Sequence, residues 1–124
     1  MPVGPPPVQE QDRSSWDENG VSAAGGAITI THAAEPGKRH IITGFEALAL
    51  GAALGNDVTI ELREDAAVRW RTGLGDAALV GERTGLMFSK PREFGLNAEA
   101  SLVADAGGAG VLMTLTLTGY TIPL

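Results

Sequence analysis

The sequence predicts an all-β protein: an antiparallel β-sandwich of about seven strands, preceded by an extended N-terminal arm. Runs of apolar and β-branched residues alternate with polar residues at a period of two, and turn residues separate these runs. Glycine makes up 17 of the 124 residues, which favours short strands joined by tight turns over long helices. The length fits one domain, and an apolar fraction of 44% is sufficient for a buried core.

Residues 1–26 are predicted to form the arm. Four prolines in the first seven positions favour extended polyproline II structure, and a run of polar residues follows them. Trp16 lies within this polar run, and tryptophan is a frequent anchor of protein interfaces. We therefore expect interface contacts from Pro5, Pro6, Pro7 and Trp16. The pattern leaves open whether Trp16 packs on its own sandwich or on a neighbouring chain.

The sandwich domain is predicted to span residues 27–124. Residues 27–33 alternate and are rich in β-branched side chains, as in a half-buried strand. Residues 39–50 carry apolar groups on both faces, which is typical of a strand that is buried on both sides. Both segments are therefore expected to be strands.

Residues 57–63 and 67–72 have the clearest alternating patterns in the chain. The first run places aliphatic side chains on one face and polar or charged side chains on the other. The second run places Val68 and Trp70 on its apolar face, next to arginines on the opposite face. Because only a short turn separates the two runs, they are predicted to form a β-hairpin.

Charge pairing fixes the register that we expect for this hairpin. Setting Glu61 across from Arg69 joins opposite charges, whereas a shift by two residues opposes Arg63 and Arg69. A shift by one residue would turn an apolar face to solvent. The favoured register leaves a three-residue loop, in which Asp65 or Ala66 takes the left-handed backbone conformation.

Three further strands are expected at residues 79–89, 96–104 and 111–120, with turn residues between them. The glycine-rich segment 105–110 lies between two alternating runs, which is typical of a hairpin loop. A series of short strands without a helical period indicates an antiparallel sandwich.

The composition excludes several classes of function. A net charge of −6 argues against nucleic-acid binding, which requires a basic surface that neutralises phosphates. The sequence contains no cysteine, so disulfides and thiolate metal sites are excluded. No apolar run reaches the roughly 18 residues of a membrane span, and residues 1–7 lack the features of a signal peptide. We expect neither a nucleic-acid partner nor a membrane partner.

Residues 37–40, Gly-Lys-Arg-His, are a basic segment. A phosphate-binding loop requires Lys followed by Ser or Thr and then a helix, whereas Arg and a strand follow here, so we expect the charged edge of a strand. His32 and His40 flank one turn and, with Glu35, offer the two nitrogens and one oxygen that a metal ion accepts. Their spacing does not require a metal, and we expect exposed or partly hydrogen-bonded histidines without an ion.

No combination of residues in the sequence indicates catalysis. Asp65, Asp76 and Asp105 lie at predicted loop tips, where carboxylates are simply solvated. The serines lack the G-x-S-x-G context of an activated nucleophile, and no glycine pattern predicts a nucleotide site. We expect no catalytic residue, no cofactor and no enzymatic activity.

Four short segments share a pattern with one class of protein. They are Arg39-His40-Ile41-Ile42-Thr43-Gly44, Trp70-Arg71, Phe88-Ser89-Lys90-Pro91 and Gly119-Tyr120-Thr121. With these segments, residues 35–122 resemble the small β-sandwich virion proteins of tailed bacteriophages, which are capsid decoration (cement) proteins and the bases of head fibres. The resemblance implies a jelly-roll-like body that lies on the outer surface of the shell and oligomerises around local symmetry points. It carries over no catalytic residue.

The resemblance and the composition together predict a structural virion protein. We expect a decoration or cement subunit that binds the outer surface of a phage head and bridges neighbouring capsid subunits. The expected partners are the major capsid protein and further copies of the chain, with a trimer favoured, and the chain is made in the host cytoplasm. An acidic protein suits the exterior of the shell better than a lumen filled with DNA. The alternative is a receptor- or glycan-binding module of a fibre or tail, which predicts exposed aromatic side chains in a groove.

Overall fold

A computed structural model describes residues 14–75 and 83–123. Regular structure in these ranges consists of eight strands. They are β1 (Ser14–Val21), β2 (Ile28–His32), β3 (Lys38–Leu50), β4 (Val58–Glu64), β5 (Ala67–Leu74), β6 (Arg83–Leu96), β7 (Ala100–Ala104) and β8 (Leu112–Pro123). Within the same ranges, no helix is long and apolar enough to cross a membrane.

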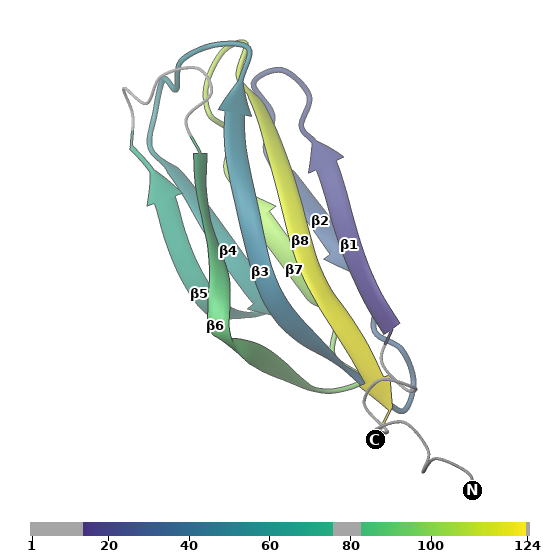
Figure 1. Ribbon diagram of the computed structural model, residues 1–124. Helices are drawn as coiled ribbons and strands as arrows, with labels where there is room; N and C mark the ends of the chain where they lie inside the picture. Colours follow the sequence, from purple (N-terminus) through teal and green to yellow (C-terminus); the bar gives the residue numbers. More distant parts are fainter. Residues whose placement is uncertain (1–13, 76–82, 124) are drawn as a thin grey trace, which may run out of the picture.

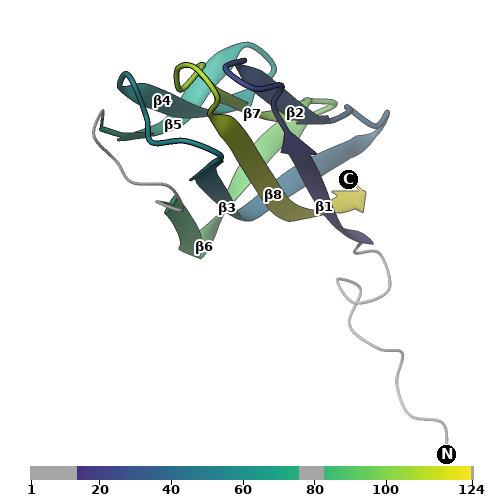
Figure 2. The ribbon, with the colours of Figure 1, turned by 90° about the horizontal axis from the view of Figure 1, so that it is seen from above.

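The strands form two antiparallel four-stranded sheets that lie face to face (Figure 1). Sheet A has the order β1-β8-β3-β6, and sheet B has the order β2-β7-β4-β5. This is the strand order of an eight-stranded jelly roll, in which the chain crosses repeatedly between two packed sheets. Figure 2 shows the two layers, with β5 and β6 at one side of the sandwich and β1 and β2 at the other. The predicted β-sandwich with a jelly-roll-like body is confirmed.

The core lies between the two sheets and is mainly aliphatic. On β8, Met113, Leu115 and Leu117 point inward and are fully buried, while the residues between them are threonines that face outward. Leu62 of β4 and Leu102 of β7 are cross-strand partners and are also fully buried. Alternation in the sequence thus becomes the inner and outer faces of these strands.

Strand β1 falls within residues 1–26, the predicted arm, and pairs along its whole length with β8. It is an edge strand with the polar residues Asp17 and Asn19 on its outer face, so it has little apolar pattern to reveal it. Trp16 and Gly20 lie on its inner face. The sandwich therefore has one strand more than predicted, and the part of the predicted arm before residue 14 lies outside the described residues.

The β4–β5 hairpin forms as predicted, but with another register. The predicted pairing of Glu61 with Arg69 is wrong, because Glu61 pairs with Arg71. A β-bulge between Val68 and Trp70 makes Arg69 an extra residue of β5, and it shifts every later pair by one position. The bulge also leaves Val68 exposed, although the sequence pattern placed it on the apolar face.

Two loop predictions also need correction. Asp65 has the predicted left-handed conformation, with a φ of 53°, but Glu64 pairs with Ala67, so the hairpin loop has two residues and not three. The segment 105–110 is not a hairpin loop, because it joins β7 in sheet B to β8 in sheet A. Alternating runs on both sides of a loop indicate two strands, but they do not indicate whether these strands share a sheet.

Strand β6 spans Arg83–Leu96, further along the chain than the predicted strand at 79–89, of which residues 79–82 lie outside the described part. Its pairing with β3 has two irregularities, and the larger is a bulge between the pairs made by Ile42 and Gly44. In this bulge, residues 88–91 lie opposite the single residue Thr43. Bulges of this kind re-aim side chains and interrupt the free edge of a sheet, so strand β6 presents no continuous ladder of free backbone groups.

Candidate functional site

The predicted interface residues are described only in part. Three of them, Pro5, Pro6 and Pro7, lie outside the described residues. Trp16 packs on its own chain, where its ring stacks on that of His32 with the ring centroids 4.0 Å apart. The indole Nε1–H donates a hydrogen bond to Thr121 Oγ1 at 3.0 Å. The half-buried indole thus fixes β1 to the sandwich, and a contact between Trp16 and a partner remains a prediction.

His40 is fully buried, so the prediction that it lies at a charged edge is wrong; Lys38, two residues earlier, is exposed. His40 Nε2 is 2.8 Å from the carbonyl oxygen of Ala33, and His40 Nδ1 is 2.7 Å from Thr121 Oγ1. Because a carbonyl only accepts, Nε2 carries the proton of the neutral ring. The Thr121 hydroxyl then donates to His40 and accepts from Trp16, which satisfies both imidazole nitrogens.

His32 lies beside His40 and between two carboxylates. The centroids of the two imidazole rings are 4.6 Å apart, with 70° between the ring planes. His32 Nδ1 is 2.8 Å from Glu18 Oε2, and His32 Nε2 is 3.5 Å from Glu35 Oε2. One ligand atom each of His32, Glu35 and His40 lies within 4.8 Å of the other two. The turn between the histidines therefore brings these three residues together, and we refer to them as the histidine cluster.

A second candidate site, which the sequence did not predict, lies where β5 and β6 form edges of the two sheets. The described residues include six large hydrophobic side chains that are exposed, and four of them are on these two strands: Val68, Leu86, Met87 and Leu96. Leu86 and Met87 are adjacent and line one groove, whereas Val68 and Leu96 lie elsewhere on these strands. Clustered apolar exposure marks contact surfaces, whereas single exposed side chains are common. The β5–β6 rim is defined here as Trp70, Leu86, Met87, Phe88, Lys90 and Arg92.

The β5–β6 rim combines aromatic rings with cations. Trp70 and Phe88 pack edge to face, with ring centroids 5.8 Å apart. The guanidinium carbon of Arg92 lies 5.1 Å from the centroid of the Trp70 ring, within the range of a cation–π interaction. With Lys90 and Pro91, these side chains line an open groove of about 860 Å³. Pro91 was the available signal in the sequence, because proline within a strand is confined to edges and bulges.

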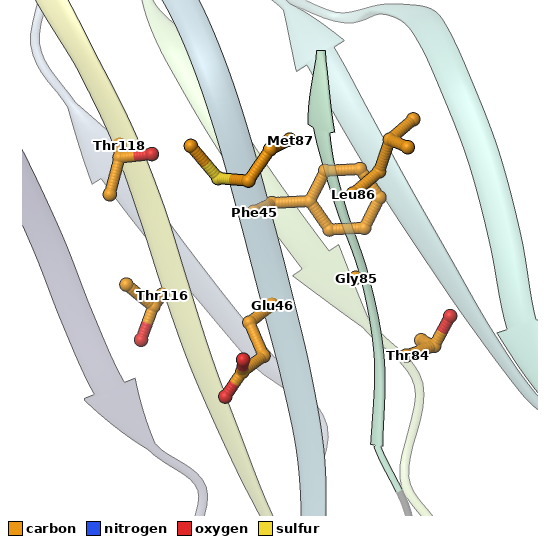
Figure 3. Close-up of a pocket in the computed structure, with 8 residues that line it drawn as sticks. All are labelled: Phe45, Glu46, Thr84, Gly85, Leu86, Met87, Thr116 and Thr118. Carbon is orange, nitrogen blue, oxygen red and sulfur yellow. The ribbon is translucent and has the colours of Figure 1, made fainter. Parts of the chain in front are cut away.

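A shallow hollow adjoins this groove on the outer face of sheet A (Figure 3). Its volume is about 650 Å³, and its lining includes Glu46 of β3 with Thr116 and Thr118 of β8. Met87, which is 70% exposed, lines both the hollow and the groove and extends across β3 toward Thr118 (Figure 3). Gly44 permits this path, because a Cβ atom at that position would lie 2.4 Å from Met87 Sδ.

Charges on sheet B neutralise one another, whereas those of the rim do not. Glu61 accepts hydrogen bonds from Arg63 Nε at 3.0 Å and from Arg71 Nε at 2.9 Å. The hydrogen bonds from Arg63, and to a smaller extent those from Arg71, hold the pKa of the Glu61 carboxyl below its ordinary value. No ion pair within the described residues involves Lys90 or Arg92. Lys90 and Arg92 thus place positive charge at the rim, beside Glu93, which lines the same groove and pairs with Arg39.

No known protein family and no curated protein matches the sequence. Among solved structures, the chain is similar to dimeric latent PorU from Porphyromonas gingivalis, with a TM-score of 0.56 and 12% identity. This match covers 90% of the present chain and only 13% of the PorU chain. The similarity supports the fold and nothing beyond it.

Two other structural neighbours represent different functions. One is a family 16 carbohydrate-binding module, with a TM-score of 0.40 and 17% identity, covering 77% of this chain and 70% of the module. The other is the coat protein of Tobacco streak virus, with a TM-score of 0.38 and 10% identity, covering 91% of this chain and 87% of the coat protein. At these TM-scores neither neighbour supports a function, so the function must be argued from the residues of this chain.

Proposed function

We propose that this chain is a structural virion protein, a decoration or cement subunit that binds the outer surface of a bacteriophage head and bridges neighbouring capsid subunits. The observation that carries the proposal is the asymmetry of sheet A. The N-terminal segment joins the sandwich at β1, one edge of the sheet, while the exposed Met87 lies on β6, the opposite edge. A rigid body with contact regions at opposite edges is suited to span two neighbouring subunits.

The β5–β6 rim has the composition of a protein interface. Aromatic residues, methionine and arginine are enriched at such surfaces, and the rim supplies Trp70, Phe88, Met87 and Arg92. Arg92 and Lys90 suit a partner with an acidic surface, because complementary charge orients and accelerates association. When one body makes two contacts, the second contact is intramolecular, so two weak contacts together give firm attachment.

The proposed partner at this surface is the major capsid protein. Further copies of the chain, in a trimer, are the proposed self-assembly around local symmetry points of the shell. The negative net charge supports a position outside the shell, away from packaged DNA. The proposal contains no catalytic step.

Co-sedimentation with undecorated phage shells tests the proposal. The full chain should bind, and Met87→Lys should reduce its affinity by about tenfold or more, since it places a charge at the centre of the apolar contact. Val21→Lys is the matched control, because Val21 is similarly exposed but lies on β1. Deletion of residues 2–13 leaves β1 intact and should also weaken binding. Full occupancy by both the Met87→Lys variant and the deletion variant would overturn the proposal.

The alternative, a glycan-binding module, requires an aromatic face that is open to a sugar ring. On the rim, the guanidinium group of Arg92 lies over Trp70, and the edge of one ring of the Trp70–Phe88 pair packs against the face of the other. This arrangement does not favour a sugar platform. A glycan array with the isolated protein distinguishes the two functions, because specific binding that Trp70→Ala abolishes would support the alternative.

A further inference from the structure

We propose that His32, Glu35 and His40 bind one divalent transition-metal ion, with Zn²⁺ as the expected occupant. Imidazole nitrogens and a carboxylate oxygen are preferred ligands of this ion. At ordinary Zn–N and Zn–O distances, two ligand atoms of a tetrahedral site are roughly 3.3–3.5 Å apart. His32 Nε2 and Glu35 Oε2 already have a separation of 3.5 Å. This site is independent of the role proposed for the β5–β6 rim.

The strongest argument for a cation is the convergence of three potential ligand atoms, one each from His32, Glu35 and His40, which lie within 4.8 Å of one another. His32 Nδ1 lies 2.8 Å from Glu18 Oε2, so the other ring nitrogen, Nε2, is the one that faces Glu35. A metal ion held between His32 Nε2 and Glu35 Oε2 would be bound by one nitrogen and one oxygen.

Each imidazole of the cluster is oriented by an oxygen atom on its other nitrogen. Glu18 Oε2 contacts His32 Nδ1 at 2.8 Å, and Thr121 Oγ1 contacts His40 Nδ1 at 2.7 Å. Histidines that bind metal ions are held in this way, which fixes both the tautomer and the direction of the ring. Trp16 adds further rigidity, since it stacks on His32 and donates to Thr121.

His40 is the one ligand that must change on metal binding. Coordination through Nε2 requires the tautomer with the proton on Nδ1, which then donates to Thr121 Oγ1. The Thr121 hydroxyl, which donated to Nδ1 before, must turn its own proton to another acceptor. Nε2 is then free to coordinate, and it already faces the loop that carries Ala33 and Glu35. Because Ala33 is exposed, water replaces the donor that its carbonyl loses.

Metal binding at this position stabilises the junction between the N-terminal segment and the sandwich. The cluster and the residues that orient it come from four strands and one loop: β1 (Trp16, Glu18), β2 (His32), the following loop (Glu35), β3 (His40) and β8 (Thr121). A ligand that binds only the folded cluster opposes the local opening of these elements. We therefore expect slower amide hydrogen exchange in β1 when Zn²⁺ is bound.

Titration of the full chain with metal ions tests the proposal. Calorimetry at neutral pH should show one Zn²⁺ per chain, and Zn²⁺ should raise the melting temperature. Co²⁺ should give visible absorption bands of a nitrogen- and oxygen-coordinated ion, whereas Mg²⁺, which prefers oxygen ligands, should not bind. The absence of both Zn²⁺ binding and Co²⁺ bands would overturn the proposal.

Substitution of one ligand locates the site. Glu35→Gln preserves size and should weaken Zn²⁺ binding by about tenfold or more, because the amide is a poor ligand. Glu93→Gln is the matched control, since Glu93, like Glu35, is a solvent-accessible glutamate paired with a basic residue, in this case Arg39. His32→Gln should abolish binding, with circular dichroism as the check of the fold. Equal Zn²⁺ affinities of Glu35→Gln and Glu93→Gln would place the ion elsewhere and overturn the assignment, whatever the result with phage shells.

Discussion

The side chains at the two edges of sheet A differ in how many interactions they make within the chain. At the β1 edge, Trp16 stacks on His32 and donates to Thr121, so the large side chain of this edge is committed internally. At the β6 edge, Met87 is exposed and Lys90 forms no ion pair within the described residues. Two roles are thus separated: the described side chains of β1 stabilise the fold and leave the proposed partner contact at that edge to the segment before residue 14, whereas Met87 and Lys90 of β6 are themselves exposed.

Both edges also avoid uncontrolled sheet extension, but in different ways. β1 is polar on its outer face, which discourages pairing with an apolar strand. β6 has a bulge at residues 88–91 and a proline, Pro91, that lacks an N–H donor. Side-chain contacts, and not strand addition, are therefore the expected mode of binding at the β5–β6 rim.

The largest effect is expected for Trp16→Ala. Loss of the indole removes its stacking on His32, its hydrogen bond to Thr121 and its buried area, and should lower the free energy of unfolding by about 3 kcal/mol. Val21→Ala, at an exposed position of the same strand, should change it by less than about 0.5 kcal/mol. Urea unfolding followed by circular dichroism measures both. Similar small values for the two variants would show that β1 is not fixed by its tryptophan.

Gly44→Ala should have the next largest effect, although Gly44 lies on the β6 side. The added Cβ atom would lie 2.4 Å from Met87 Sδ, which can move, and 2.7 Å from the backbone oxygen of Leu86, which cannot move without disturbing the strand. We expect a loss of about 2 kcal/mol in thermal unfolding experiments. Gly75→Ala is the control, because no atom of the described residues beyond its chain neighbours lies within 4 Å of its added Cβ. Equal stability of the two variants would mean that β6 adapts freely.

A smaller, pH-dependent effect is expected at Glu61 of sheet B. Hydrogen bonds from Arg63 and Arg71 hold the pKa of Glu61 below its ordinary value of 4.5, so the ionised carboxylate stabilises the folded state. This stabilisation is present above the unfolded-state pKa and is lost as the pH falls through the folded-state pKa. The wild type should therefore lose more stability than Glu61→Gln between about pH 5 and about pH 3.

Urea midpoints of both proteins at the two pH values measure this difference. The effect should be modest, because the Arg71 partner is largely exposed and the pair is screened by salt. Parallel pH profiles of wild type and variant would show that these hydrogen bonds do not stabilise the fold in solution.

The smallest change in stability is expected for Met87→Ala. Because Met87 is 70% exposed, its truncation should alter the free energy of unfolding by less than about 0.5 kcal/mol while weakening attachment to phage shells. Leu117→Ala, at a fully buried position, should cost about 3 kcal/mol and serves as the reference. A loss for Met87→Ala as large as that for Leu117→Ala would assign the rim to stability and not to adhesion.

Alternation along the sequence predicted strands that have one buried face, whereas β3 was predicted from apolar residues on both faces and has consecutive buried residues. Val58, Ile60 and Leu62 of β4 are buried, as the pattern requires. Local pattern does not predict features that depend on a distant partner. β1 has a polar sequence and is a strand because β8 pairs with it, and the bulge at Arg69 depends on how β5 meets β4.

The two candidate sites show the same division between local and distant information. His32, Glu35 and His40 are close in sequence, so their proximity was foreseeable, but the burial of His40 depends on Thr121 from the last strand. The rim brings Trp70 of sheet B to Phe88 of sheet A, and no local pattern connects these residues. A site formed within one turn could be predicted from the sequence, whereas a site formed between the two sheets could not.

The pairing of the first strand with the last has a consequence for biosynthesis. Trp16 and Thr121 are 105 positions apart, so during translation β1 leaves the ribosome long before its partner exists. The early strand has no neighbour in its sheet until β8 emerges. Anchoring of β1 therefore waits for β8, and a translation product that ends before β8 lacks it.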